Sequence, residues 1–149
     1  MKELQTILLV DDSEDNLFLM KAAFKMAKCE HPLQEVHNGD EAIAYLKGEG
    51  LYADRDKFPL PTLMLLDLNM PKKNGFDVLT WVRAQPGLRR LPVIILTSSM
   101  RGDDVAHAFD LGATSFLVKP ISLEILAAML RSLCDWIEYN QFPTLRQTA

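Results

Sequence analysis

Five residues with chemically useful side chains stand directly after short aliphatic runs. They are Asp11 and Asp12 after Ile-Leu-Leu-Val, Asp67 after Leu-Met-Leu-Leu, Thr97 after Val-Ile-Ile-Leu, and Lys119 after Phe-Leu-Val. Three carboxylates at close range repel one another unless a cation lies among them, and a hard cation such as Mg²⁺ prefers oxygen ligands. A lysine and a hydroxyl in the same place would bind an anion. The set favours transfer of a phosphoryl group to a carboxylate, where catalysis is mainly positioning and charge neutralisation.

The aliphatic runs themselves predict β-strands. Continuous Val, Ile and Leu runs without polar alternation are typical of strands buried on both faces. The four clear runs are residues 7–10, 63–66, 93–96 and 116–118, and a weaker one covers residues 33–36.

Between these runs lie stretches whose apolar residues recur three and four positions apart, which predicts amphipathic helices. Ser13 and Ser122 are candidate caps of the first and last helix. The apolar positions are, in chain order, Leu17, Met20, Phe24 and Ala27; Ala42, Ile43 and Leu46; Phe76, Leu79 and Val82; Val105, Phe109 and Leu111; Ile125, Leu126, Met129, Leu130 and Leu133.

Alternation of five strands with five helices predicts an α/β fold, with a parallel sheet and helices on both faces. In such sheets ligands bind outside the carboxyl ends of the strands. We therefore expect the five residues that follow the aliphatic runs to meet at one edge of the sheet.

Composition restricts the class of protein. The chain has 149 residues, 48% hydrophobic, which predicts a single domain. A formal charge of −4 argues against a nucleic-acid-binding protein. The N-terminus lacks an apolar signal segment, and no apolar run approaches the roughly 20 residues needed to span a bilayer. These features predict a cytoplasmic protein without membrane contact.

Cysteine and histidine offer no further chemistry in this reading. Cys29 and Cys134 lie far apart and form no Cys-x-x-Cys motif, so we expect two free, buried thiols. None of His31, His37 and His107 stands at a predicted strand end, and we expect surface or turn residues without a functional role.

From about residue 6 to residue 133 the sequence resembles the receiver domain of bacterial two-component response regulators. The motifs are Leu-Val-Asp11-Asp12, Leu-Leu-Asp67-Leu-Asn-Met-Pro71 with Gly75, Ile-Leu-Thr97-Ser and Val-Lys119-Pro120. The resemblance implies a flavodoxin-like receiver fold, with five parallel strands in the order 2-1-3-4-5 and five flanking helices. It also implies a receiver domain over residues 1–133, with residues 134–149 extending the last helix into a tail and no separate output domain.

The resemblance also implies a role for each site residue. Asp67 would be the phosphoacceptor for a histidine kinase, and Mg²⁺ would be held by Asp11, Asp12, Asp67 and the backbone carbonyl of Asn69. Lys119 would pair with the phosphoryl oxygens, Thr97 and Phe116 would switch conformation, and a cis peptide bond would precede Pro120. Asn69 and Ser99 would tune dephosphorylation, while Lys72 and Lys73 read as solvated loop charges.

Two segments exceed a minimal receiver, namely the loop of residues 48–62 and the C-terminal extension. Both resemble the stand-alone receivers that partner bacterial and cyanobacterial phytochrome kinases, whose extensions take part in homodimers. Trp136, Tyr139 and Phe142 are therefore candidate dimer contacts. The alternative is that these aromatic side chains fold back on their own domain.

Other functions remain open at this stage. A generic stand-alone receiver or phosphorelay intermediate would show the same motifs, and a degenerate receiver would bind a partner without phosphorylation. A Mg²⁺-dependent aspartyl-phosphate phosphohydrolase usually has an acid two residues after its nucleophile, where this chain has Asn69. A flavin or nucleotide protein needs a glycine-rich loop after the first strand. We expect that the protein is not an enzyme and catalyses only its own phosphorylation and dephosphorylation.

Overall fold

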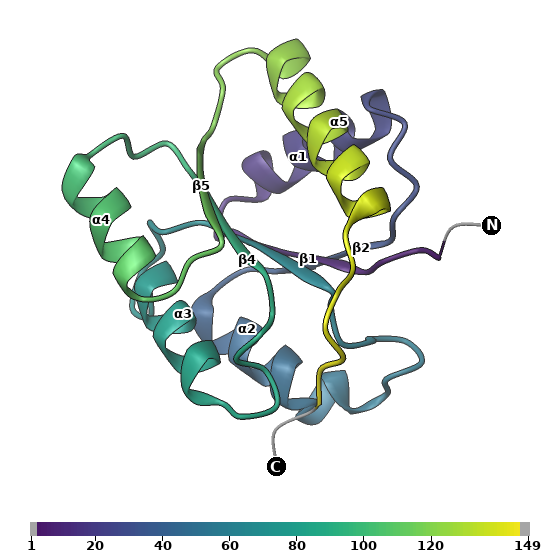
Figure 1. Cartoon of the computed structure of the whole chain (residues 1–149), viewed down its shortest axis with the longest axis vertical. Helices are drawn as coiled ribbons and strands as arrows, with labels where there is room; N and C mark the ends of the chain where they lie inside the picture. Colours follow the sequence, from purple (N-terminus) through teal and green to yellow (C-terminus); the bar gives the residue numbers. More distant parts are fainter. Residues whose placement is uncertain (1–2, 147–149) are drawn as a thin grey trace.

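The five aliphatic runs form one parallel sheet in the order β2-β1-β3-β4-β5 (Figure 1). The structure is a computed structural model, and it describes residues 3–146. The strands are β1 (Ile7–Val10), β2 (Leu33–Val36), β3 (Leu63–Leu66), β4 (Val93–Thr97) and β5 (Ser115–Val118). The helices are α1 (Glu14–Met26), α2 (Gly39–Lys47), α3 (Gly75–Ala84), α4 (Gly102–Asp110) and α5 (Leu123–Tyr139), with a short 3₁₀ helix, η1 (Gly50–Ala53). This confirms the predicted α/β fold and strand order.

Helices cover both faces of the sheet. Helices α1 and α5 pack on one face, over a core that includes Ile7, Leu9 and Phe24. Helices α2, α3 and α4 pack on the other face, over Leu8 and Val10. Alternate residues of β1 thus enter opposite cores, which explains why its sequence is apolar at every position.

The ends of the helices follow local signals. The Ser13 side chain accepts a hydrogen bond from the Asn16 N–H, and Ser122 does the same for the Ile125 N–H, so both predicted caps are confirmed. Asn74 begins α3 through a reciprocal capping box with Asp77.

The predicted apolar faces are right for α1 and only partly right for α4 and α5. Phe109 is half exposed and Ile125 more so, while Ala108 is the fully buried residue of α4. α4 lies near the edge of the sheet and buries a narrow stripe, so a larger apolar residue on its flank stays in solvent. These side chains expose apolar surface on α4 and α5.

The long connection between α2 and β3 is an ordered extension of the core. Tyr45 of α2 is fully buried and contacts the rings of Tyr52 and Phe58 from this connection. The Arg55 guanidinium donates to the carbonyl oxygens of Tyr45, Leu46 and Phe58, and so satisfies the C-terminal end of α2. The connection therefore covers the C-terminal end of α2.

After α5, residues 140–146, which we call the C-terminal strap, cross the N-terminal edge of the sheet (Figure 1). Phe142 packs on the α1–α5 core and Leu145 on the opposite core. The Arg146 N–H donates to the Gly87 carbonyl oxygen at 2.9 Å. The strap thus joins both layers, as in the fold-back alternative, and Phe142 also meets Trp136 edge to face with ring centroids 5.6 Å apart.

Two expectations about single residues differ from what the structure shows. Cys29 and Cys134 form a disulfide and are not free thiols, because the fold brings the turn after α1 against α5 although 105 positions separate them in sequence. His31 lies in a bend, as expected, but it is buried and not at the surface, and its Nδ1 atom accepts a hydrogen bond from the Gln5 N–H.

Across residues 3–146, none of the helices combines the length and apolar character that crossing a bilayer requires.

Candidate functional site

Three carboxylates meet at the carboxyl ends of β1 and β3. Val10 and Leu66 are paired in adjacent strands, so the next residue of each strand, Asp11 and Asp67, leaves the sheet at the same level. Carboxylate oxygens of Asp11, Asp12 and Asp67 lie within 4.8 Å of one another. Asp11 and Asp67 are buried, at 5% and 7% exposed, whereas Asp12 faces solvent. The structure therefore brings together the three carboxylates that the sequence placed at this edge of the sheet.

Among the described residues, one ammonium group faces these carboxylates. The Nζ atom of Lys119 lies 2.7 Å from Oδ2 of Asp11 and 3.8 Å from Oδ2 of Asp67. One positive charge against three carboxylates leaves an excess of negative charge, and a dense set of oxygen donors binds hard divalent cations. Asp12 is open to solvent, which provides an entry path. The donor set therefore fits a divalent metal.

The electrostatics of Asp67 reflect this crowding. Burial raises the pKa of Asp67 above its usual value, the charge of Lys119 acts in the opposite direction, and the neighbouring Asp11 carboxylate raises it again. Hydrogen bonds from the Asn69 backbone and the Thr97 hydroxyl also favour the ionised form. Additional positive charge at this site, from a cation, would favour the carboxylate that a nucleophile requires.

Thr97 places its hydroxyl between the carboxylates and the next loop. The side chain is fully buried at the end of β4, and its Oγ1 atom accepts weak 3.4 Å hydrogen bonds from the Asn69 amide and from the Ser99 N–H. Ser99 donates its own hydroxyl hydrogen to Asp104 in α4. Sequence reasoning missed Asp104, although its position in the first turn of a helix after Ser99 was a usable signal.

The loop that carries Asp67 is fixed from behind by Gly75. A Cβ atom at Gly75 would lie 2.4 Å from the Asp67 carbonyl oxygen and 2.9 Å from the Leu68 Cα atom. The Gly75 N–H also donates to the Leu68 carbonyl oxygen at 3.1 Å. The first residue of α3 must therefore lack a side chain for the loop to reach its position.

Phe116 lies on β5, beside β4, and is partly buried against the α2–α3–α4 core. The resemblance to receivers implied a cis peptide bond before Pro120, but this expectation was wrong, because the Lys119–Pro120 bond is trans. Trans is the more stable isomer of an X–Pro bond by about 0.5–1 kcal/mol. The Lys119–Asp11 ion pair forms with the trans bond in place.

Other predicted residues lie outside this cluster. Lys72 is exposed with a positive φ of 64°, and the Nζ atom of Lys73 lies 3.6 Å from an Asp40 oxygen. The His107 ring packs against the Phe76 ring at a tilt, and His37 contacts Glu14 and Glu41 at the end of β2.

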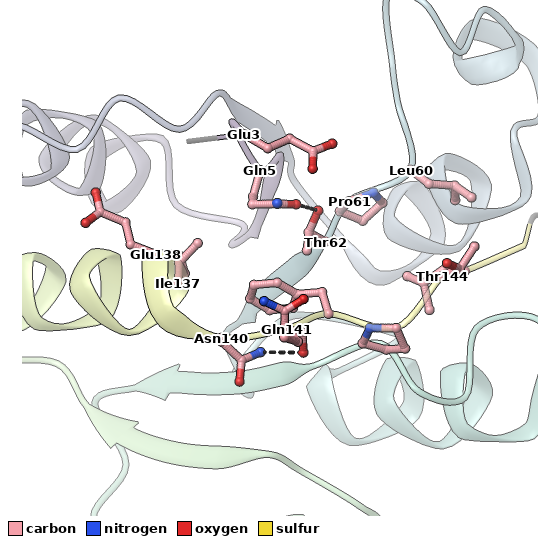
Figure 2. Close-up of a pocket in the computed structure, with 13 residues that line it drawn as sticks. Glu3, Gln5, Leu60, Pro61, Thr62, Ile137, Glu138, Asn140, Gln141 and Thr144 are labelled. Carbon is pink, nitrogen blue, oxygen red and sulfur yellow. Dashed lines mark hydrogen bonds between the residues drawn. The ribbon is translucent and has the colours of Figure 1, made fainter. Parts of the chain in front are cut away.

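A large cavity lies at the other edge of the sheet and does not belong to this site. It has a volume of about 460 Å³, with walls from the C-terminal strap and from residues before β1 and β3. Figure 2 shows Gln5 hydrogen-bonded to Thr62 on one wall, with Asn140 and Gln141 across from them. The cavity is at the N-terminal ends of the strands, whereas the three carboxylates follow the C-terminal ends.

Comparison with known proteins agrees with the fold. A family model described as the response regulator receiver domain matches residues 7–131. A sequence relative is response regulator Rcp1 of Synechocystis sp., 36% identical over 93% of each chain. The Mn²⁺-bound structure of Rcp1 has a TM-score of 0.81 at 35% identity, covering 94% of this chain and 99% of that one.

Two further solved structures are similar over nearly the whole chain. The phosphorylated cyanobacterial phytochrome response regulator RcpA is 33% identical, with a TM-score of 0.86 over 95% of this chain and 100% of its own. Response regulator RPA3017, from red light signaling of R. palustris, is 30% identical, with a TM-score of 0.90 over 95% and 99%.

The fold, the strand order and the acidic cluster define a receiver module of two-component signalling. The chain belongs to the response regulator receiver family, and it is similar to phytochrome response regulators over most of its length.

Proposed function

We propose that this chain is a phosphorylation-switched signalling protein whose phosphoacceptor is Asp67. One observation carries the proposal: the Asp67 carboxylate shares a 4.8 Å cluster with Asp11 and Asp12 and faces the Lys119 ammonium. A carboxylate oxygen of Asp67 attacks the phosphorus of a phosphohistidine, the P–N bond breaks, and the histidine nitrogen takes a proton from solvent. The chain turns over only its own phosphoryl group and acts on no other substrate.

The cation that we propose is Mg²⁺, held by Asp11, Asp12, Asp67 and the Asn69 backbone carbonyl. When bound, it supplies positive charge to the phosphoryl oxygens. Lys119 supplies a fixed positive charge from the protein itself. Its side chain is only 16% exposed, so its electrostatic attraction to the phosphoryl oxygens is stronger than it would be in bulk water. Asn69 and Ser99 stand beside Thr97 and control how water approaches the acyl phosphate.

The switch that we propose begins at Thr97. A phosphoryl group on Asp67 accepts the hydrogen of the Thr97 hydroxyl and draws Thr97 away from Asn69 and Ser99, whose hydrogen bonds to its Oγ1 atom are long at 3.4 Å. Movement of Thr97 at the end of β4 makes room beside β5, where Phe116 is only partly buried. Phe116 then turns inward and the α4–β5 surface changes shape.

The kinase that we propose is phytochrome-type, located with this chain in the cytoplasm, where ATP supplies the phosphoryl group. The support is similarity over more than nine-tenths of the chain to the phytochrome response regulator RcpA. Phosphoryl transfer from purified phytochrome kinases and from unrelated histidine kinases would test it. Transfer only from the unrelated kinases would make the chain a general receiver or phosphorelay intermediate.

We also propose a homodimer through the β5–α5 face. An apolar depression of about 410 Å³ lies there, lined by Leu117, Met129 and Trp136 among others, and Tyr139 is 84% exposed nearby. Phe142 packs on its own domain, so the proposed contacts are Trp136 and Tyr139. Light scattering of Tyr139→Lys and of wild type would test it, and equal masses near that of a monomer would refute it.

The acceptor itself is tested by intact-mass spectrometry after incubation with Mg²⁺ and acetyl phosphate. Wild type should gain one phosphoryl group, and the gain should vanish with a chelator and in Asp67→Asn. A gain of one phosphoryl group in the Asp67→Asn variant would place the acceptor elsewhere. No gain in wild type would indicate a receiver that works without phosphorylation.

A further inference from the structure

The Cys29–Cys134 disulfide joins the turn after α1 to the C-terminal half of α5. The two Cα atoms are 6.1 Å apart, within the usual range for a bridge of this kind. Four of the five strands, β2 to β5, lie between the two cysteines in sequence. The bridge therefore connects elements that only the folded chain brings together.

The same junction has a second, non-covalent tie. The Nη1 atom of Arg131 donates to the carbonyl oxygens of Ala27, at 2.7 Å, and Lys28. Its Nη2 atom pairs with Asp135 at 2.9 Å. The C-terminal end of α1 is thus held to α5 twice, and only the disulfide depends on redox conditions.

A small reductant can reach the bridge. A cavity of about 300 Å³ opens beside it, and both cysteines line this cavity. Cys134 is buried, but Cys29 is only partly buried. Lys28 and Arg131 line the cavity together with the acidic Glu30 and Glu138, so charged side chains of both signs surround the bridge.

The bridge lies in the C-terminal half of α5, which leads into the C-terminal strap. After Cys134, α5 runs only to Tyr139, and the strap then crosses the edge of the sheet to Arg146. Phe142 and Leu145 anchor the strap on the two cores, and the strap walls the large cavity in Figure 2. How firmly the strap stays in place depends on how firmly the end of α5 is fixed.

We propose that the Cys29–Cys134 disulfide is a reducible lock on the C-terminal strap. A dithiol attacks the bridge and the S–S bond breaks; two electrons and two protons pass from the dithiol, which leaves two cysteine thiols and an oxidised reductant. The oxidised chain holds the strap down, and the reduced chain releases it more often. Disulfides that form in a reducing compartment are usually transient or act as redox sensors. The sensing role therefore rests on the proposed cytoplasmic function. The lock involves no residue of the Asp67 site.

Hydrogen exchange followed by mass spectrometry tests the lock on the full chain, air-oxidised and after dithiothreitol. Amides of residues 135–146 should exchange about tenfold faster after reduction, while β1 and β3 remain protected. The double variant Cys29→Ser with Cys134→Ser should match the reduced protein in both buffers. Arg131→Gln, which loosens the same junction without touching sulfur, should raise exchange in both redox states.

Three outcomes would overturn the proposal. Two alkylatable cysteines in the air-oxidised, denatured protein would show that the bridge does not form. Unchanged exchange of residues 135–146 on reduction would show that the bridge does not control the strap. An equal rise in β1, β3 and the strap would show a general loss of stability. Phosphorylation of Asp67 is measured separately, so its failure leaves each of these results interpretable.

Discussion

The ammonium nitrogen of Lys119 is closer to Asp11 than to the proposed phosphoacceptor Asp67, at 2.7 Å against 3.8 Å. The Lys119 ammonium therefore neutralises part of the negative charge that would bind a metal ion. A phosphoryl group on Asp67 would bring new anionic oxygens within its reach and draw it away from Asp11.

Replacing Lys119 with Gln should separate metal binding from phosphorylation. Two unit charges about 4 Å apart interact by about 4 kcal/mol at an effective dielectric constant of about 20. Loss of the Lys119 charge, which repels a cation, should therefore tighten Mg²⁺ binding by tenfold or more. Phosphorylation by acetyl phosphate should slow by roughly 100-fold, as for loss of one preorganised charge. Calorimetry and intact-mass time courses measure the two effects.

The matched control is Lys72→Gln, which removes an exposed charge from the loop after Asp67. It should change both quantities less than twofold. Equal Mg²⁺ affinity in wild type and Lys119→Gln would contradict the proposed competition.

Gly75→Ala should damage the loop that carries Asp67. The new Cβ would meet the Asp67 carbonyl oxygen at 2.4 Å, and backbone atoms cannot move aside as a flexible side chain can. We expect a loss of about 2–4 kcal/mol in the free energy of unfolding, in the range of strained core substitutions, together with slower phosphorylation. Urea denaturation measures the first effect.

Gly102→Ala supplies the comparison, because no atom lies within 4 Å of the Cβ position there and Gly102 begins a helix. Alanine should stabilise the protein by about 0.4–1 kcal/mol. If the two alanine variants lost stability equally, the close approach at Gly75 would not be the cause.

Thr97→Ala should uncouple phosphorylation from the conformational change. The variant keeps the Asp67 cluster and Lys119, so it should still accept one phosphoryl group. Without the hydroxyl, the phosphoryl group has nothing to attract at the end of β4, and exchange rates in α4 and β5 should not respond. Thr97→Ser keeps the hydroxyl and should respond as wild type does. A full response in Thr97→Ala would refute the role of Thr97.

Stability should fall at high pH because of Tyr45. Burial raises the pKa of Tyr45 to about 12, from 10 in the unfolded chain. A group with a raised folded-state pKa contributes stability that is complete below pH 10 and is lost as pH rises toward 12, here about 2–3 kcal/mol.

Comparison with Tyr45→Phe isolates that loss. At pH 8 the variant should be about 1 kcal/mol less stable, because the Tyr45 hydroxyl donates to the Pro59 carbonyl oxygen at 2.7 Å. The difference should shrink or reverse between pH 10 and 12. A difference that stays constant over this range, in urea denaturation, would contradict the prediction.

The sheet and the chemistry of its edge could be predicted because both are local in sequence. A strand buried on both faces must be apolar throughout, and the residue after it must leave the sheet at the edge where ligands bind. The position of the strap could not be predicted in this way, because Phe142 and Leu145 are as apolar as residues of a dimer contact. The Cys29–Cys134 pair depends on the packing of α1 against α5, for which linear spacing carries no signal.

The closed covalent ring has a mechanical consequence. With the bridge intact, a force applied to the two ends of the chain can extend only the residues before Cys29 and after Cys134, because the segment between the two cysteines, which are 105 positions apart, bears no tension. That span would add about 350 Å of contour length after reduction, at roughly 3.3–3.6 Å per residue. Of the strands that the structure describes, β2 to β5 lie inside the ring and only β1 lies outside it. In the oxidised molecule these four strands would therefore stay folded when the two ends of the chain are pulled.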